Sequence, residues 1–166
     1  MNVLDALSRG SEWPEVAALT RLSQTTAKQH LAIAQARFVP DQTLLDNLRY
    51  PTLRRAINEG IVPVTVDPTL ADQTLSDLNH IQLFGIHGLS LGHHSEEVSQ
   101  RLHVSPRTLK RYVSEAYDYF GHYGRRRLEP TIRTMYERGV FRVPAAQPER
   151  TRATREAIVA AHLPLL

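Results

Sequence analysis

The apolar residues of one stretch in the second half of the chain, EEVSQRLHVSPRTLKRYVSEAYDYFG (96–121), follow the spacing of two helices joined by a sharp turn. The first, short helix can bury one side through Val98, Leu102 and Val104. Ser105 is a good N-cap residue for the second helix, and Pro106 suits its first position. The buried face of that second helix is predicted to consist of Leu109, Val113, Ala116 and Phe120.

The opposite face of the second helix is basic in its N-terminal half, with Arg107, Lys110, Arg111 and Ser114 left exposed. His103 stands in the turn, where a left-handed backbone is often needed and His tolerates it better than a branched residue. A helix of this kind, held across a short first helix, has the geometry that enters a DNA major groove. Lys and Arg side chains suit guanine edges. The alternative interpretation is an ordinary surface helix with a solvated charged face.

The run SEEVSQRLHVSPRTLKRYVSEAYDYFG resembles the LuxR-type helix-turn-helix, the output domain of many bacterial response regulators and quorum-sensing regulators. IQLFGIHGLS resembles the first helix of that family and PTIRTMYERGVF its fourth, so the resemblance covers roughly residues 75–143. Ser95 is the expected N-cap of the short helix, and the link before it is longer than is usual in the family. The resemblance implies base-facing roles for Lys110, Arg111 and Ser114, and a phosphate contact for Thr108.

The first half of the chain repeats the pattern of the second. Shifting it by 82 residues aligns Glu15-Val16 with Glu97-Val98 and brings Ser23, Thr26, Lys28, Ala34 and Phe38 onto Ser105, Thr108, Lys110, Ala116 and Phe120. Further on, PTLRRAINEGIVPV (51–64) matches PTIRTMYERGVFRV (130–143) at an offset of 79. The chain is therefore predicted to be all-α, with two four-helix LuxR-like modules in tandem.

The predicted organisation has four parts. A divergent first module occupies residues 1–64, an extended linker residues 65–74 within the proline-containing stretch 61–74, the clearer second module residues 75–143, and a tail with a possible helix residues 144–166. In the first module we expect a short helix to end near Gly10, Ser11 to cap the next helix, and Trp13 to be a packing residue. An inserted stretch, 41–50, is expected to add a helical turn.

The reading helix of the first module is expected at about residues 24–38. Its base-facing side chains would be Thr25, Lys28 and Gln29, and Thr26 would contact a phosphate. Gln favours adenine and Arg favours guanine, so the two modules should prefer different bases. The divergence of this module leaves open that it binds protein or is purely architectural.

Charge is unevenly distributed over the 166 residues. The net charge is +3, made up of 7 − 8 = −1 over residues 1–74 and 13 − 9 = +4 over residues 75–166, so the second half should bind polyanions more strongly. A basic loop between the third and fourth helices of the second module places three arginines beside the reading helix, where they suit phosphates: Arg125, Arg126 and Arg127. A solvated charge run is the alternative.

Other chemistries find little support in the sequence. There is no cysteine, no run of eighteen apolar residues and no signal-peptide pattern at the start, so we expect a cytoplasmic, nucleoid-associated protein without membrane contact. His87, His93, His94 and His103 cluster, but no acidic partner stands at a metal-ligand spacing. No phosphate-binding loop or catalytic motif occurs, and we expect neither a cofactor nor an enzyme activity.

These patterns predict a sequence-specific DNA-binding regulator of transcription, from a bacterium or a mobile element, that reads a non-palindromic bipartite site on double-stranded DNA with helices at about 24–38 and 106–120. RNA polymerase or a regulatory protein is a further possible partner. The two fourth helices would pair within one chain as a pseudo-dimer, or between chains as a homodimer. One alternative is an antagonist that binds a sigma factor or regulator, and another is a recombination or partition accessory protein.

Overall fold

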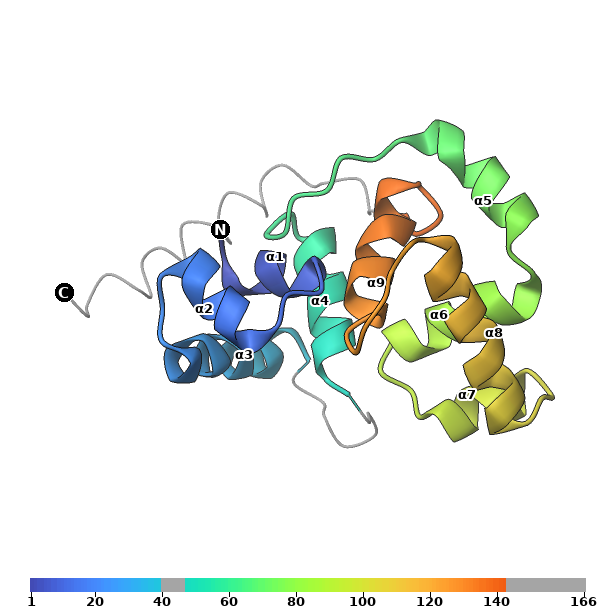
Figure 1. Ribbon diagram of the computed structural model, residues 1–166, viewed down its shortest axis with the longest axis horizontal. Helices are drawn as coiled ribbons and strands as arrows, with labels where there is room; N and C mark the ends of the chain where they lie inside the picture. The colour runs from blue at the N-terminus through green and yellow to red at the C-terminus, as the bar shows by residue number, and fades with distance from the viewer. Residues whose placement is uncertain (40–46, 143–166) are drawn as a thin grey trace.

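The computed structural model describes residues 1–39 and 47–142 of the chain, and all regular secondary structure in those ranges is helical (Figure 1). This confirms the all-α prediction. The helices are α1 (Val3–Ser8), α2 (Trp13–Thr20), α3 (Gln24–Phe38), α4 (Arg49–Asn58), the 3₁₀ helix η1 (Pro68–Leu70), α5 (Ala71–Asp77), α6 (His80–Ser90), α7 (Ser95–Arg101), α8 (Pro106–Tyr119) and α9 (Leu128–Glu137).

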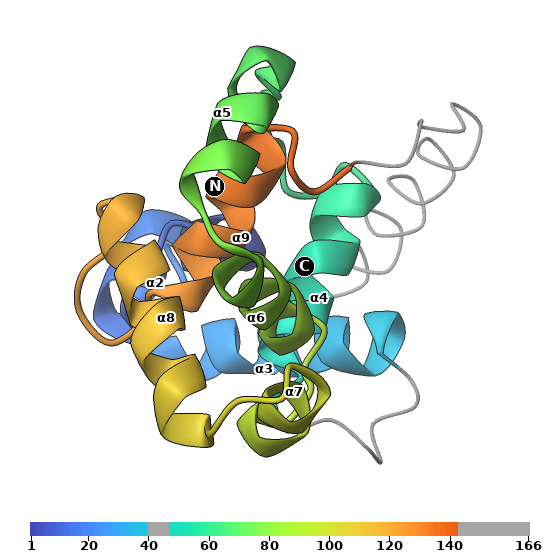
Figure 2. The ribbon, with the colours of Figure 1, turned by 90° about the vertical axis from the view of Figure 1, so that its right-hand side faces the viewer.

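Helices α4 and α9 pack against each other in the middle of the molecule. Helices α1 to α3 lie on one side of this pair and α6 to α8 on the other (Figure 1). A quarter turn brings α6, α7 and α8 toward the viewer, in front of the central pair (Figure 2). We call α1–α4 the first unit and α6–α9 the second unit. One continuous core of buried apolar residues runs through both.

The two predicted reading helices, α3 and α8, start in the way that the sequence predicts. Ser23 accepts a hydrogen bond from the backbone N–H of Thr26 at 3.1 Å, and Ser105 accepts one from Thr108, also at 3.1 Å. Such a cap satisfies one of the free N–H groups of the first turn. The turn before each cap is left-handed, with φ of 58° at Arg21 and 54° at His103, which confirms the expectation for His103.

The buried faces of these helices also follow the apolar pattern. Leu109, Val113 and Ala116 of α8 are buried, and Leu31 of α3 is 5% exposed. Phe120 follows the end of α8 and packs at the edge of the core. The spacing of apolar positions therefore orients α8, whereas α3 buries only Ala27 and Leu31 and leaves Ile33 exposed.

The other two caps differ from their expected residues by one position. Glu12, and not Ser11, is the N-cap of α2, and His94 is the N-cap of α7, so that Ser95 is already inside the helix. Neither cap makes a side-chain hydrogen bond. Ser11 instead offers its carbonyl oxygen to Arg126 at 2.6 Å.

The structure corrects the prediction of an extended linker over residues 65–74. The chain is extended only as far as Asp67, after which η1 and α5 form a helical segment from Pro68 to Asp77. The Asp67 carboxylate accepts a hydrogen bond from the N–H of Thr69 at 3.0 Å, and Pro68 fits the first helical position. Proline here starts a helix, whereas the sequence interpretation treated it only as a breaker. Helix α6, the first helix of the second unit, follows this segment and begins at His80.

This helical segment is held against the second unit. The N–H of Asp67 donates to the carbonyl oxygen of Glu137 at 2.6 Å, and the Tyr119 hydroxyl donates to Asp77 at 2.8 Å. Arg138 contacts the same place, with its guanidinium 3.3 Å from the Tyr119 hydroxyl. The connection between the units is thus part of the packed structure. The helical turn expected in residues 41–50 falls largely on residues 40–46, and the predicted tail on residues 143–166; both lie outside the described ranges.

Candidate nucleic-acid interface

The N-terminal half of α8 presents its cations to solvent. Arg107 and Lys110 are exposed, and the Arg111 side chain is 65% exposed. Arg111 lies over the Tyr112 ring, 4.9 Å from its centroid, and is 3.7 Å from Glu115. An exposed pair of this kind holds a guanidinium only weakly, so Arg111 can exchange Glu115 for another acceptor. The Thr108 hydroxyl is half-buried against the cap, 2.8 Å from the Ser105 hydroxyl.

Ser114 lies one turn further along α8 and already has a partner. The Arg127 guanidinium donates to its hydroxyl oxygen at 3.1 Å and also lies over the Tyr117 ring, 5.0 Å from the centroid. Burial raises the pKa of Tyr117, so this ring stays neutral beside the guanidinium. Ser114 therefore borders the exposed basic face of α8, and Arg127 fixes its hydroxyl.

The three arginines of the basic loop lie in different surroundings. Arg125 is exposed. The Arg126 side chain is only 13% exposed and reaches the first unit, where it donates to the Ser11 carbonyl oxygen at 2.6 Å and lies 3.2 Å from a Glu12 carboxylate oxygen. Arg127 is 30% exposed and contacts α8. The sequence predicted three phosphate contacts, whereas the fold brings only Arg125 fully to the surface.

Helix α3, the predicted reading helix of the first unit, has fewer cations in its N-terminal half than α8. Thr25 and Gln29 of α3 are exposed, and Thr26 is half-buried at the cap, 2.9 Å from the Ser23 hydroxyl. Lys28 is exposed, but its ammonium lies 5.6 Å from the centroid of the Trp13 ring. It is thus drawn toward α2 by a cation–π contact.

Two further cations make cation–π contacts with the Trp13 ring, and the sequence did not predict them. Arg49 lies 5.8 Å and Arg126 5.3 Å from its ring centroid. Trp13 is half-buried against the core, as expected for a packing residue. Its cationic partners come from α3, from α4 and from the loop of the second unit. No local sequence signal marks this cluster, because Arg126 is far away along the chain.

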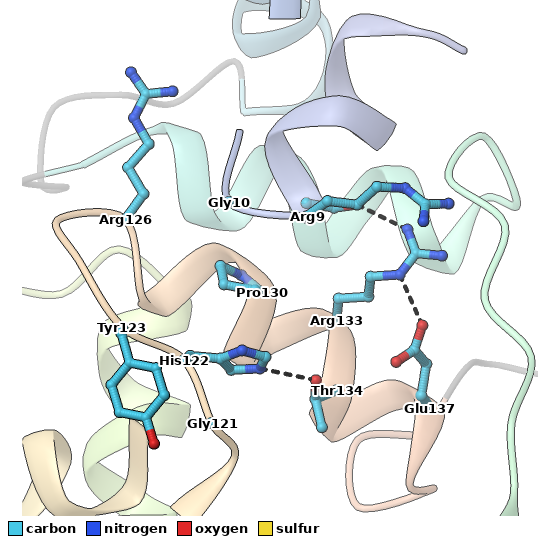
Figure 3. Close-up of a pocket in the computed structure, with 11 residues that line it drawn as sticks. Arg9, Gly10, Gly121, His122, Tyr123, Arg126, Pro130, Arg133, Thr134 and Glu137 are labelled. Carbon is cyan, nitrogen blue, oxygen red and sulfur yellow. Dashed lines mark hydrogen bonds and ion pairs between the residues drawn. The ribbon is translucent and has the colours of Figure 1, made fainter. Parts of the chain in front are cut away.

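An open depression of about 450 Å³ lies between the end of α1, the loop after α8 and α9 (Figure 3). Two polar contacts are formed between residues that line it. His122 Nε2 is 3.0 Å from the Thr134 hydroxyl, and Arg133 donates to Glu137 at 2.7 Å. Burial lowers the pKa of His122. The His122–Thr134 contact ties the loop to α9, while the Arg133–Glu137 pair lies within α9. The lining residues form no recognisable catalytic set.

Within residues 1–39 and 47–142, no group of three or more His, Cys, Asp or Glu side chains is placed to hold a metal ion. His93 forms a pair with Glu97 at 3.1 Å. Among the helices of the same ranges, none is both long and apolar enough to cross a bilayer.

No family model, no curated protein and no solved structure matches the chain.

Proposed function

We propose that the protein is a sequence-specific DNA-binding regulator of transcription, which reads a bipartite site with α8 and α3. One observation carries the proposal. Helix α8 is capped and buried on one face, and it leaves Arg107, Lys110 and Arg111 exposed along its N-terminal half. This is the part of a recognition helix that contacts base edges in a major groove.

The other predicted residues would contact phosphates, contact bases or support the interface. Arg125 would contact a phosphate, and Thr108 would do so at the helix cap. In α3, Thr25, Gln29 and Lys28 would read the second half of the site, and Thr26 would bind its phosphate. Arg126 and Arg127 would act by holding the loop and α8 in place, since both guanidinium groups already have protein partners.

A second candidate function concerns α3 alone. Ile33 on this helix is 62% exposed, and Lys28, the cation of its N-terminal half, lies over the Trp13 ring. With Lys28 held over that ring, the N-terminal half of α3 offers little positive charge to a phosphate backbone, and a weakly charged surface suits a protein partner better. In this alternative the protein is an antagonist that binds a sigma factor or another regulator.

Selection of binding sites from a random DNA duplex pool tests the proposal. We expect an enriched sequence with two separate parts. Lys110→Ala and Arg111→Ala should each relax base preference in one part only, by about 1–3 kcal/mol for a lost base contact. Arg125→Ala should weaken binding to every sequence and reduce the salt slope by up to about 0.9.

Arg55→Ala is the matched control. It removes the same charge from an exposed position on α4, where Arg55 is paired with Glu59 at 2.7 Å. We expect it to leave the selected sequence unchanged. If no sequence is enriched at low salt, DNA reading is wrong and the protein-binding candidate takes its place.

A further inference from the structure

The two units exchange contacts with each other in matching pairs. Helix α1 of the first unit packs on α9 of the second, and α6 of the second packs on α4 of the first. We call the α1–α9 contact and the α6–α4 contact the two joints, and between them α4 packs on α9 (Figure 1). Each unit therefore contacts the other through its first and fourth helices.

The match extends to single glycines and prolines. Gly10 ends α1 with φ of 82°, and a Cβ atom there would lie 3.3 Å from Pro130 of α9 and 3.3 Å from the Arg126 carbonyl oxygen. Gly92 follows α6 with φ of 90°, and a Cβ atom there would lie 3.3 Å from Pro51 of α4 and 3.2 Å from the Asn47 carbonyl oxygen. Both joints have the same shape.

Two arginines repeat the same exchange. Arg133 of α9 donates to the Ser8 hydroxyl at 2.9 Å, and Arg54 of α4 donates to the Ser90 hydroxyl at 2.6 Å. Each serine in turn donates to a carbonyl oxygen three residues earlier, at 2.6 Å in α1 and 2.7 Å in α6. The equivalence thus reaches the level of individual hydrogen bonds.

Such reciprocal contacts define the relation between the units. If α1 meets α9 in the same way as α6 meets α4, then the operation that carries the first unit onto the second also carries the second onto the first. A half-turn has this property, as in an isologous dimer, whereas a translation along the chain does not. The two reading helices, α3 and α8, are therefore related by an approximate two-fold axis.

We infer that one chain presents α3 and α8 to the two halves of a single site in inverted orientation, as a pseudo-symmetric reader of an imperfect inverted repeat. The inference rests on the proposed function. The central pair is already buried within the chain, since Leu53 and Ile57 of α4 are 1% exposed and Ile132 and Met135 of α9 are fully buried. A second copy cannot use that surface, and one chain fills one site.

The first test compares duplexes in which the two selected half-sites are joined in inverted or direct orientation at the selected spacing. We expect the wild-type protein to bind the inverted arrangement about tenfold more tightly or better, because a misplaced half-site loses at least one base contact. Native mass spectrometry should find one chain per duplex. Equal or tighter binding to the direct arrangement, or two chains per duplex, overturns the inference and leaves the proposed function standing.

The second test makes the two reading helices alike. The triple variant Thr25→Arg, Gln29→Arg and Ala32→Ser gives exposed positions of α3 the residues found at Arg107, Arg111 and Ser114 of α8. Its selected site should become a closer inverted repeat. The control, Gln73→Arg with Ser76→Arg, adds the same charge on exposed positions of α5 and should select the wild-type site.

A direct repeat selected by the triple variant would overturn the inverted arrangement alone. Failure of the wild-type protein to select any duplex would remove the proposed function, and the inference with it. The two failures are therefore distinguishable.

Discussion

Asp5 and His87 occupy equivalent positions in the two units, and each faces an arginine from the other unit. Arg133 lies 2.8 Å from the Asp5 carboxylate, while Arg54 lies 3.4 Å from His87 Nδ1. One joint thus contains an ion pair, and the other sets a cation beside an imidazole. Burial, then Arg54 and then His93 lower the pKa of His87. The Phe141 ring lies edge-on to the imidazole, 5.6 Å between centroids, and His87 keeps part of its side chain exposed.

This difference predicts a pH dependence of stability. The folded-state pKa of His87 is below its unfolded value of about 6.5, so the unfolded chain binds the proton more readily. Stability is complete above about pH 6.5 and falls as pH decreases through the folded-state pKa. His87→Asp should abolish this part of the loss and add about 0.2–1 kcal/mol through a pair with Arg54. Urea unfolding between about pH 5 and 8 measures both effects.

His122 contributes a loss of the same sign, because burial lowers its pKa as well. His122→Gln serves as the control and should remove only that second contribution. A wild-type stability that is constant over this range, or that rises on acidification, would contradict the assignment to His87.

Single residues also show where sequence reasoning succeeds and where it stops. The Ser105 cap and the left-handed His103 were predictable, because both depend on neighbours within a few positions. The fate of Arg126 was not, since its partners Ser11 and Glu12 lie in the other unit. The sequence shows that a loop arginine needs a hydrogen-bond acceptor. Whether that acceptor is a protein group or an external ligand depends on the fold.

At the scale of helices, the sequence pattern located the two predicted reading helices, α3 and α8, within about two residues of the observed bounds. The matched segments that start at Pro51 and Pro130 correspond to fourth helices that begin two residues earlier, at Arg49 and Leu128. The sequence pattern missed η1 and α5, whose residues show no clear period and whose packing depends on α9. It also did not predict the joints between units, because glycine and proline positions were interpreted only as local turn signals.

Gly92 tests how much the joint between α6 and α4 contributes. Gly92 and Gly124 have nearly the same φ, 90° and 91°, but a Cβ atom at Gly124 would have no neighbour within 4 Å. Gly124→Ala should therefore cost only the backbone strain, about 1–2 kcal/mol. Gly92→Ala should cost a further 1–3 kcal/mol, roughly, because its methyl group presses on Pro51 and the Asn47 carbonyl oxygen.

Chemical denaturation of the two variants measures the difference. If Gly92→Ala and Gly124→Ala lower the free energy of unfolding equally, the structure around Gly92 accommodates a methyl group. The close approach to Pro51 would then add nothing to the cost of the substitution.

For the whole molecule, the internal repeat predicted two units in sequence and left open how the fourth helices pair. The structure describes direct packing of α4 on α9 with exchanged contacts on both sides. The repeat alone could not decide this, since the same two segments could equally have paired between chains. The choice depends on the joints at Gly10 and Gly92 and on Arg133, none of which stands out in the sequence.

Exchanged contacts predict that the two units unfold together. Removing either unit would expose apolar residues of the central pair, including Leu53, Ile57, Ile132 and Met135, and would leave Asp5 without Arg133. The cost of that exposure falls on both units at once, so neither should unfold alone. Trp13, the single tryptophan of the chain, lies in α2, and its fluorescence reports on the first unit and on its contact with Arg126 of the second. Far-UV circular dichroism reports on both, and we expect the two signals to follow one coincident two-state transition in urea. A fluorescence transition that precedes or follows the circular dichroism transition would show units that unfold independently, and a fragment of residues 80–142 that unfolds cooperatively by itself would lead to the same conclusion.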